Sequence, residues 1–457
     1  MGIFKAYDIR GIYGKDFDET LAYKLGYFLP KLLKTNKVLV GRDIRLSGKS
    51  LHDSLVAGII DSGADVYDLE LATTPYVYYV TRVYNFDASV QITASHNNKE
   101  YNGFKISTTA SMPVGYDNGL NKLEEMVNND EIILSKEKGR VIEFDKRNEY
   151  LIFQKQKLSD YSSLNIGIDC SNGMANLFIK DLIPNALYIN DTMDGHFPGH
   201  EPNPLNTNNH IQLIDLILKN KLDFGIMFDG DADRVAFIDN NGRFISPDLM
   251  VALLAEYYLE QEGNQNVLYD VRTSKSVTED IKKHGGIPNI WKVGHAFAKR
   301  KMKELDAVVG GELAGHYYFR EFGYCDSAIL ACIILLNIIL KLQSEGKTIA
   351  QKIDEITLYA NTGELNFVVD DKDGCIAEIE SILSKKYNVI TKYDFDGVRL
   401  EFEDFWLSLR KSNTEPYLRL VLEANSKEIL DEKLNEVMEV VNKYIVKEGD
   451  GLCKKNI

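Results

Sequence analysis

The rest of the chain is organised around one segment, Ala88-Ser89-Val90-Gln91-Ile92-Thr93-Ala94-Ser95-His96-Asn97-Asn98. Residues 88–92 form an alternating apolar run that is typical of a β-strand, and the small polar residues after it predict a tight loop. Ser95 is therefore expected where a strand ends, with His96 beside it and Lys99 and Lys105 shortly after. A serine in that position is suited to take or give a charged group.

The same pattern of a short apolar strand followed by a polar loop recurs along the first three quarters of the chain. The expected strands are residues 37–40, 88–92, 164–169, 224–228, 266–270 and 307–309. Helical stretches such as residues 50–61 lie between them. Strands that alternate with helices predict α/β layers, with ligand sites at the carboxyl ends of the strands.

After about residue 360 the pattern changes to closely spaced strands, which predicts an α+β unit. The expected strands there are residues 365–369, 398–402, 406–410 and 418–422, followed by an amphipathic helix over 426–446. We therefore predict four domains: 1–145, 146–248 and 249–360, each α/β, and 361–457, which is α+β.

Composition excludes several classes of protein. A length of 457 residues is too great for one core, and a net charge of −15 argues against a general nucleic-acid binder. Five cysteines without CxxC spacing favour reduced thiols, no zinc site and a cytoplasmic protein. The N-terminus has no signal-peptide pattern, and the longest apolar run, 328–340, is too short to span a bilayer, so we expect a buried core helix and no membrane partner.

The strongest local signal is the loop Asp229-Gly230-Asp231-Ala232-Asp233-Arg234, directly after an expected strand. Three carboxylates at alternate positions repel one another unless a cation or hydrogen bonds hold them, and oxygen ligands suit Mg²⁺ or Ca²⁺. An EF-hand is excluded, because its sixth and twelfth positions would be Arg234 and Asn240. A phosphotransferase with Asp229 as its nucleophile remains an alternative.

Two further loops are suited to bind a sugar phosphate. In Gly310-Gly311-Glu312-Leu313-Ala314-Gly315-His316, the glycines allow close approach of a ligand and Glu312 could accept hydrogen bonds from two hydroxyls. Upstream, Lys292-Val293-Gly294-His295 holds a second Gly-His pair. Near the C-terminus, Arg410-Lys411-Ser412-Asn413-Thr414 combines a guanidinium, an amide and two hydroxyls, a compact clamp for phosphate.

These loops, in this order and over essentially the whole chain, resemble the α-D-phosphohexomutase superfamily, most closely its phosphomannomutase/phosphoglucomutase branch. Residues 94–97 match its phosphoserine loop, 229–234 its metal loop, 311–316 its sugar loop and 410–414 its phosphate-binding loop. Residues 6–11, 101–105, 195–204 and 270–272 match further segments of that branch. The resemblance implies three α/β domains and a C-terminal α+β domain in a heart-shaped molecule around a central cleft.

The resemblance also implies a mutase that interconverts hexose 1-phosphate and 6-phosphate, of mannose or glucose, through a phosphoserine and a 1,6-bisphosphate. Ser95, Arg10, Lys105 and His316 would be catalytic, and Asp229, Asp231, Asp233 and phosphorylated Ser95 would bind Mg²⁺. The substrate would contact Tyr7, Arg234, Arg272, His295, Glu312, Arg410, Ser412, Asn413 and Thr414. Expected ligands are sugar phosphates, with glucose or mannose 1,6-bisphosphate as activator, and the chain would be a monomer or homodimer.

The chain departs from the family pattern at Asn98, where proline is usual, and at Ala314, where serine is common. The second change removes a hydroxyl contact to the sugar and leaves the preferred sugar open. Phosphoglucosamine mutase remains a close alternative. An Asp-nucleophile sugar phosphatase and a non-catalytic sugar-phosphate binding protein are alternatives of other classes.

Overall fold

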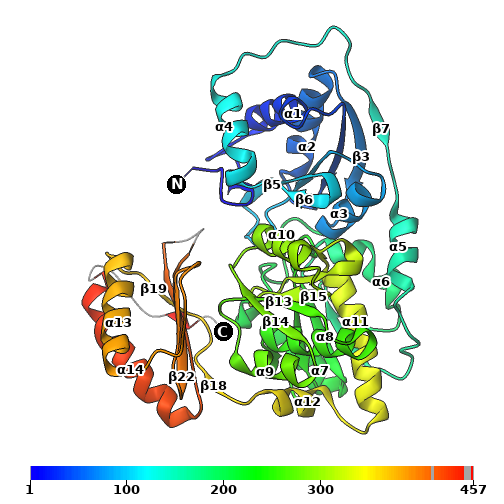
Figure 1. The fold of residues 1–457 in the computed structure, drawn as a ribbon. Coiled ribbons are helices and arrows are strands. Elements are labelled where there is room, and N and C mark those ends of the chain that lie inside the picture. Colours follow the sequence, from blue (N-terminus) through cyan, green and yellow to red (C-terminus); the bar gives the residue numbers. More distant parts are fainter. Residues whose placement is uncertain (1, 413–415, 447–453, 456–457) are drawn as a thin grey trace.

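The structure is a computed structural model that describes residues 2–412, 416–446 and 454–455 (Figure 1). Four sheets follow one another along the chain, each with its own helices. The first three units pack together, and the C-terminal unit lies beside the third (Figure 1). The expected α/β class with a C-terminal α+β domain is therefore confirmed.

The first unit is a mixed sheet of order β1-β5-β4-β2-β3-β7, with β6 on β5. Its strands are β1 (Ile9–Ile12), β2 (Lys37–Arg42), β3 (Asp65–Leu71), β4 (Ala88–Ile92), β5 (Tyr101–Thr108), β6 (Met112–Pro113) and β7 (Val141–Glu143). Its helices are α1 (Glu19–Leu33), α2 (Gly48–Asp61), α3 (Thr74–Val83) and α4 (Leu120–Asn129). Strand β4 is buried along its whole length because it lies between β2, parallel to it, and β5, antiparallel to it.

The second unit is a five-stranded sheet of order β12-β11-β10-β8-β9. It contains α5 (Arg147–Lys155), β8 (Ile166–Asp169), α6 (Ile179–Leu182), β9 (Leu187–Ile189), α7 (Ile211–Asn220), β10 (Phe224–Phe228), β11 (Val235–Asp239) and β12 (Phe244–Ile245). Strands β10 and β11 pair antiparallel up to Phe228 and Val235, so residues 229–234 form the loop of a hairpin.

The third unit has the strand order β14-β13-β15-β16-β17. It contains α8 (Pro247–Glu262), β13 (Asn266–Asp270), α9 (Lys275–Lys283), β14 (Ile287–Trp291), α10 (His295–Leu305), β15 (Val309–Gly311), β16 (Tyr317–Phe319), β17 (Cys325–Asp326), α11 (Ala328–Ser344) and α12 (Ile349–Ile356). The strand expected over 307–309 begins at Val309 and continues through Gly311. A Cβ on Gly310 would lie 2.8 Å from the Leu268 carbonyl oxygen, so glycine is needed there for close packing.

The C-terminal unit is an antiparallel sheet of order β20-β21-β22-β23-β19-β24, with β18 on β23. It contains β18 (Ala360–Asn361), β19 (Leu365–Phe367), α13 (Lys372–Lys386), β20 (Thr391–Tyr393), β21 (Val398–Glu401), β22 (Phe405–Lys411), β23 (Leu418–Ala424), α14 (Lys427–Tyr444) and β24 (Lys454–Lys455). Helices α13 and α14 cover one face of this sheet (Figure 1).

The hydrophobic cores follow this division only in part, although the first unit has a core of its own between its sheet and helices α1, α2 and α4. One large core joins residues of the first three units, including Tyr76 of α3, Phe228 of β10 and most of α11. The C-terminal unit has a core of its own between its sheet and α13 and α14. The apolar run at 328–340 is thus part of a buried helix, as expected.

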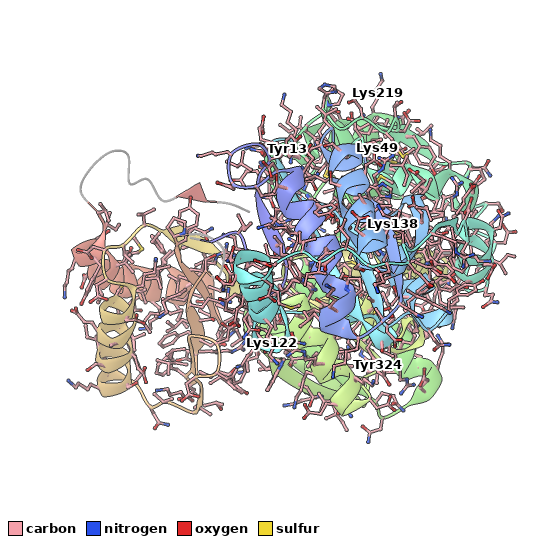
Figure 2. All side chains as sticks on the ribbon, turned by 90° about the horizontal axis from the view of Figure 1, so that it is seen from above. Tyr13, Lys49, Lys122, Lys138, Lys219 and Tyr324 are labelled. Carbon is pink, nitrogen blue, oxygen red and sulfur yellow. The ribbon has the colours of Figure 1, made fainter. Side chains whose placement is uncertain are left out.

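Charged side chains cover the outside of the molecule, and Lys49, Lys122 and Lys138 of the first unit point outward (Figure 2). Within the described part of the chain, no single helix is long and apolar enough to cross a membrane. Helices α11 and α12 pass that test only as a pair, and they are bent by 96° at their junction.

Candidate active site

Ser95 lies in a buried loop directly after β4 and is only 1% exposed. Its hydroxyl donates a hydrogen bond to Asp229 Oδ2 at 2.8 Å and lies 3.3 Å from His96 Nδ1. Its backbone has φ of +53°, in the left-handed region that is unfavourable for a residue with a side chain. The surrounding contacts therefore hold the serine in a conformation that an isolated loop would rarely adopt.

The hairpin loop of the second unit places three buried carboxylates beside this serine. Asp229, Asp231 and Asp233 each offer one oxygen within 4.8 Å of the others. Oδ1 of Asp231 and Oδ1 of Asp233 are buried, and neither has a hydrogen-bond partner among the described residues. Clustered carboxylate oxygens with unused acceptor capacity fit a hard divalent cation such as Mg²⁺.

Lys105 of β5 is the cation that faces this loop. Its ammonium lies 2.7 Å from Asp231 Oδ2 and also forms an ion pair with Asp233. Burial alone would lower the pKa of Lys105, but the surrounding carboxylates outweigh burial and raise it. Burial and the neighbouring Asp231 and Asp233 raise the pKa of Asp229 well above its usual value.

Arg10 of β1 brings a second positive charge to the serine loop. Its guanidinium donates to Asn97 Oδ1 at 2.7 Å and to Asp8 Oδ2 at 2.5 Å. Although burial opposes it, the Asp8 carboxylate raises the pKa of Arg10. Arg234 connects the metal loop to the third unit, because its backbone pairs with that of His316.

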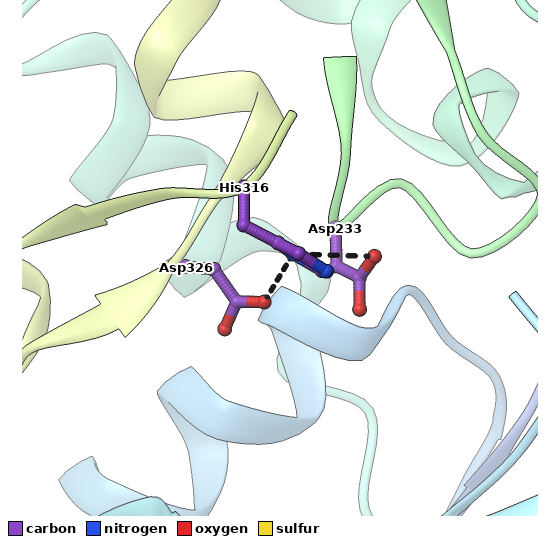
Figure 3. A group of neighbouring side chains, drawn as sticks. All are labelled: Asp233, His316 and Asp326. Atoms are coloured by element: carbon purple, nitrogen blue, oxygen red, sulfur yellow. Dashed lines mark ion pairs between the residues drawn. The ribbon is translucent and has the colours of Figure 1, made fainter. Parts of the chain in front are cut away.

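His316 lies between two carboxylates that come from different units (Figure 3). Its Nδ1 is 2.9 Å from Asp326 Oδ2 in β17 and 3.8 Å from Asp233 Oδ1 in the metal loop. Lys299 of α10 is buried on the far side of Asp326, with its ammonium 2.7 Å from Asp326 Oδ1. His316 Nδ1 faces Asp326, but within the described part of the chain neither this nitrogen nor the Asp326 oxygens form a hydrogen bond, so the contact is electrostatic.

Glu312 is buried in the loop after β15, and both of its carboxylate oxygens contact the protein. Oε1 accepts a hydrogen bond from the Gly294 N–H and Oε2 accepts one from the Tyr318 hydroxyl. Gly294 has φ of +126°, and a Cβ there would lie 2.7 Å from the Tyr7 ring, so Gly294 permits a close approach of the first and third units.

Tyr7 also packs edge-on against His295, with ring centroids 5.5 Å apart. His295 is the first residue of α10, and its ring centroid lies 6.0 Å from that of His316. Burial, followed by the charge of Lys299, lowers the pKa of His295 well below its usual value, which favours the neutral imidazole.

The predicted phosphate-binding residues lie in the C-terminal unit and at its border with the third. Arg410 is buried in β22, with Nη2 3.1 Å from Asp396 Oδ1, and Ser412 follows that strand. Arg272 is held by Asp270 at 2.7 Å and by Glu364 at 2.9 Å. Asn413 and Thr414 lie outside the described residues.

Several residues at the site were not singled out from the sequence. Lys299 and Asp326 hold His316, Thr74 donates to Asp231 Oδ2 at 2.5 Å, and Arg45 contacts the serine loop. Asp326 gave no specific signal, since acidic residues are common just before the N-terminus of a helix. Lys299 and Thr74 look like ordinary helix residues.

In a separate group, Glu256, Asp280 and His284 each offer one possible metal-ligand atom within 4.8 Å of the others. The ammonium of Lys352 lies 2.6 Å from Glu256 Oε2 and already neutralises that carboxylate. This group is an ion-paired contact between α8, α9 and α12.

Similarity to known proteins defines the class of this chain: an intramolecular phosphotransferase built from four domains. Each of the four units matches a domain of phosphoglucomutase/phosphomannomutase: domain I over residues 1–132, domain II over 147–242, domain III over 246–359 and the C-terminal domain over 364–440. The chain belongs to the phosphoglucomutase/phosphomannomutase family and is a phosphohexomutase.

Relatives support this assignment over the full length. A phosphomannomutase of Methanocaldococcus jannaschii is 36% identical over 96% of this chain and 98% of its own length. A phosphomannomutase of Vibrio cholerae is 33% identical over 96% of this chain and 98% of its own length. The crystal structure of a phosphoglucomutase/phosphomannomutase family protein from Burkholderia thailandensis has a TM-score of 0.87 at 26% identity, covering 99% of this chain and 98% of that one.

Proposed function

We propose that this protein interconverts the 1-phosphate and 6-phosphate of mannose or glucose through phosphorylated Ser95 and a hexose 1,6-bisphosphate intermediate. One observation carries the proposal: the Ser95 hydroxyl donates to Asp229 at 2.8 Å, within a buried group in which Lys105 bridges Asp231 and Asp233. A serine hydroxyl that donates to one carboxylate of such a cluster, with an ammonium paired to the other two, is suited to carry a phosphoryl group.

The residues present fit Mg²⁺, since Asp231 and Asp233 each keep a buried oxygen that accepts no hydrogen bond from the residues that the structure describes. Asp229, Asp231 and Asp233 would hold the ion together with a phosphoryl oxygen on Ser95. When bound, the ion would screen the negative charge of the phosphoryl group during transfer.

In each half-reaction, the bond between phosphorus and Ser95 Oγ breaks while a bond to a sugar hydroxyl oxygen forms, or the reverse. Arg10 and Lys105 supply positive charge to the group in transfer. The surrounding carboxylates raise the pKa of Lys105, which favours its protonated form. Lys105 is therefore better suited to supply positive charge than to act as a base. His316, held through Nδ1 by Asp326 at 2.9 Å, is therefore the better acceptor for the proton of the sugar hydroxyl.

The remaining predicted residues would orient the sugar and grip its second phosphate. Glu312 still has lone pairs for sugar hydroxyls after accepting one hydrogen bond at each oxygen. Tyr7, Arg234, Arg272, His295, Arg410, Ser412, Asn413 and Thr414 complete the proposed binding set. After the first transfer, the bisphosphate must turn around so that its other phosphate faces Ser95.

Intact mass and peptide mapping test the proposal, before and after incubation with glucose 1,6-bisphosphate and Mg²⁺. We expect the mass of one phosphoryl group on Ser95. Label on Asp229 would instead indicate a carboxylate nucleophile, and no label together with no mutase activity would favour a binding protein. Turnover of mannose, glucose and glucosamine 1-phosphates then identifies the sugar, with Ala314→Ser testing the missing hydroxyl of the sugar loop.

A further inference from the structure

Arg45 is fully buried beneath the loop that carries Ser95. It lies between β2 and α2, is 1% exposed, and comes from a segment that none of the predicted roles involves. Its hydrogen bonds go to backbone oxygens of the serine loop and of Tyr101 and to Asp43, and its guanidinium also lies 5.2 Å from the centre of the Phe197 ring. The guanidinium donates to the carbonyl oxygens of Ser95 at 2.8 Å, Asn97 at 2.6 Å, Asn98 at 2.5 Å and Tyr101 at 3.0 Å.

The other side of the Ser95 backbone is held from the same segment. The Ser95 N–H donates to Thr93 Oγ1 at 2.9 Å, and the Thr93 hydroxyl in turn donates to Asp43 Oδ2 at 2.7 Å. Asp43 Oδ2 also accepts from Arg45 Nε at 3.1 Å, and Asp43 Oδ1 accepts from the Arg45 N–H at 2.9 Å. The N–H and the carbonyl of Ser95 are therefore both tied to one buried ion pair.

This double attachment accounts for the backbone conformation of the serine. Ser95 has φ of +53°, which is unfavourable for any residue with a side chain unless its surroundings over-determine it. The second unit closes the loop from outside, because a Cβ on Gly230 would lie 2.6 Å from the Ser95 carbonyl oxygen. With its backbone fixed in this way, the Ser95 side chain points at Asp229.

We propose that Arg45, acting with Asp43 and Thr93, is the positioning device of the phosphoryl carrier. It holds Ser95 in the left-handed conformation that directs Oγ to the metal loop, and it places a buried positive charge beneath a loop that becomes negative on phosphorylation. The inference rests on the proposed role of Ser95. Arg45 contacts no reacting atom, so it is a positioning residue rather than a catalytic one.

The first test compares Arg45→Lys with Arg42→Lys, which makes the same chemical change three residues away. Lysine cannot reach four carbonyl oxygens at once, because it lacks the planar fork of donors. We expect kcat to fall about 10²-fold in Arg45→Lys, since small misplacements of a reacting group have effects of that size. KM for the sugar phosphate should change less than about 2-fold, because no group that binds it is altered.

Arg42→Lys should retain the wild-type kcat, since Arg42 contacts Glu70 and the Asp43 carbonyl but not the serine loop. An Arg45→Lys enzyme with the wild-type kcat would overturn the inference. So would a rise in KM with kcat unchanged, which would assign Arg45 to substrate binding.

Thr93→Val and Thr93→Ser provide an independent test if Arg45→Lys fails to fold. Valine has the shape of threonine but removes the acceptor for the Ser95 N–H and the donor to Asp43, so kcat should fall about 10-fold, as expected for one buried hydrogen bond. Thr93→Ser keeps the hydroxyl and should restore kcat. Equal kcat values in the wild type and Thr93→Val would overturn the inference.

The rate at which glucose 1,6-bisphosphate labels dephosphorylated enzyme distinguishes this inference from the proposed function. Slower labelling of Ser95 in Arg45→Lys and Thr93→Val than in the wild type supports the positioning role. Equal rates in all three proteins would overturn that role and leave the proposed function intact. No label on Ser95 of the wild type would overturn the proposed function itself.

Discussion

The half of the site that surrounds Ser95 and the half that contains Arg410 differ in where the partners of their charged side chains come from. Around Ser95, groups from the first, second and third units meet directly: Lys105 contacts Asp231 and Asp233, and His316 lies between Asp233 and Asp326. Arg410 instead pairs with Asp396 of its own domain, 3.1 Å away.

Under the proposed function, this difference fits two separate tasks: phosphoryl transfer around Ser95 and phosphate recognition around Arg410. The transfer half is assembled from three units, and within the described part of the chain one oxygen each of Asp231 and Asp233 has no hydrogen-bond partner. In the recognition half, the guanidinium of Arg410 is neutralised by Asp396, which also accepts a hydrogen bond from the Val293 N–H of the third unit at 2.8 Å. A phosphate that binds Arg410 must compete with Asp396, so binding there is expected to be weaker and more reversible than the contacts around Ser95.

The largest effect is expected from Ser95→Ala, which should lower kcat by at least about 10³-fold by removing the carrier oxygen. Ser89→Ala, in the strand β4 that precedes the Ser95 loop, is a matched control, because the Ser89 hydroxyl is buried without a hydrogen-bond partner among the described residues. Steady-state kinetics and thermal melting of both variants make the comparison. Turnover by Ser95→Ala at the rate of Ser89→Ala would exclude the phosphoserine.

Lys105→Met should lower kcat about 10²-fold, the usual cost of removing one charged group from a transfer site. Half-saturation by Mg²⁺ should move to a lower concentration, because the ammonium no longer neutralises Asp231 and Asp233. Exposed Lys99, six residues earlier, gives the control Lys99→Met. A higher Mg²⁺ requirement in Lys105→Met would show that the lysine supports the metal loop instead of competing for it.

Asp326→Asn should lower kcat about 10-fold, in the range found for groups that orient a catalytic residue. The amide can present its NH₂ group to His316 Nδ1 and so favour the other tautomer. ¹⁵N spectra of the labelled histidines report that tautomer directly, with His316→Gln used for assignment. An unchanged tautomer together with reduced kcat would assign Asp326 to a different role.

The smallest effects are expected in the recognition half, and they should appear in KM. Arg410→Ala should raise KM about 10-fold, and Ser412→Ala about 2-fold, because a charged contact contributes more than a neutral one. Asp396→Asn should lower KM slightly by releasing Arg410. If Arg410→Ala changed kcat more than KM, the contrast between the two halves would be wrong.

The sequence predicts elements well where a local pattern is strong. The strand over 88–92 corresponds to β4, the strand over 224–228 to β10, and the helix over 426–446 to α14, which spans Lys427–Tyr444. Loops after these strands contain Ser95 and the three aspartates. The sequence predicts a strand over 307–309, whereas β15 runs from Val309 through Gly310 and Gly311. This shift was not predictable, because glycine is accommodated in a strand according to what packs against it.

The supporting contacts could not be read in the same way. Arg45 bonds to oxygens 50 to 56 residues away in the chain. Lys299 and Asp326 come together only because α10 and β17 meet in the folded third unit. No spacing rule connects such residues, so a single sequence identifies the reactive groups more readily than the groups that hold them.

The separate core of the C-terminal unit has a consequence for how the protein unfolds. Regions with a continuous core tend to melt together, and regions with their own core melt on their own. The two tryptophans report on different regions: Trp291 lies in β14 of the third unit and Trp406 in β22 of the C-terminal unit. We therefore expect calorimetry to resolve a transition of the C-terminal unit apart from the rest of the molecule, so that a single melting temperature would not describe the whole protein.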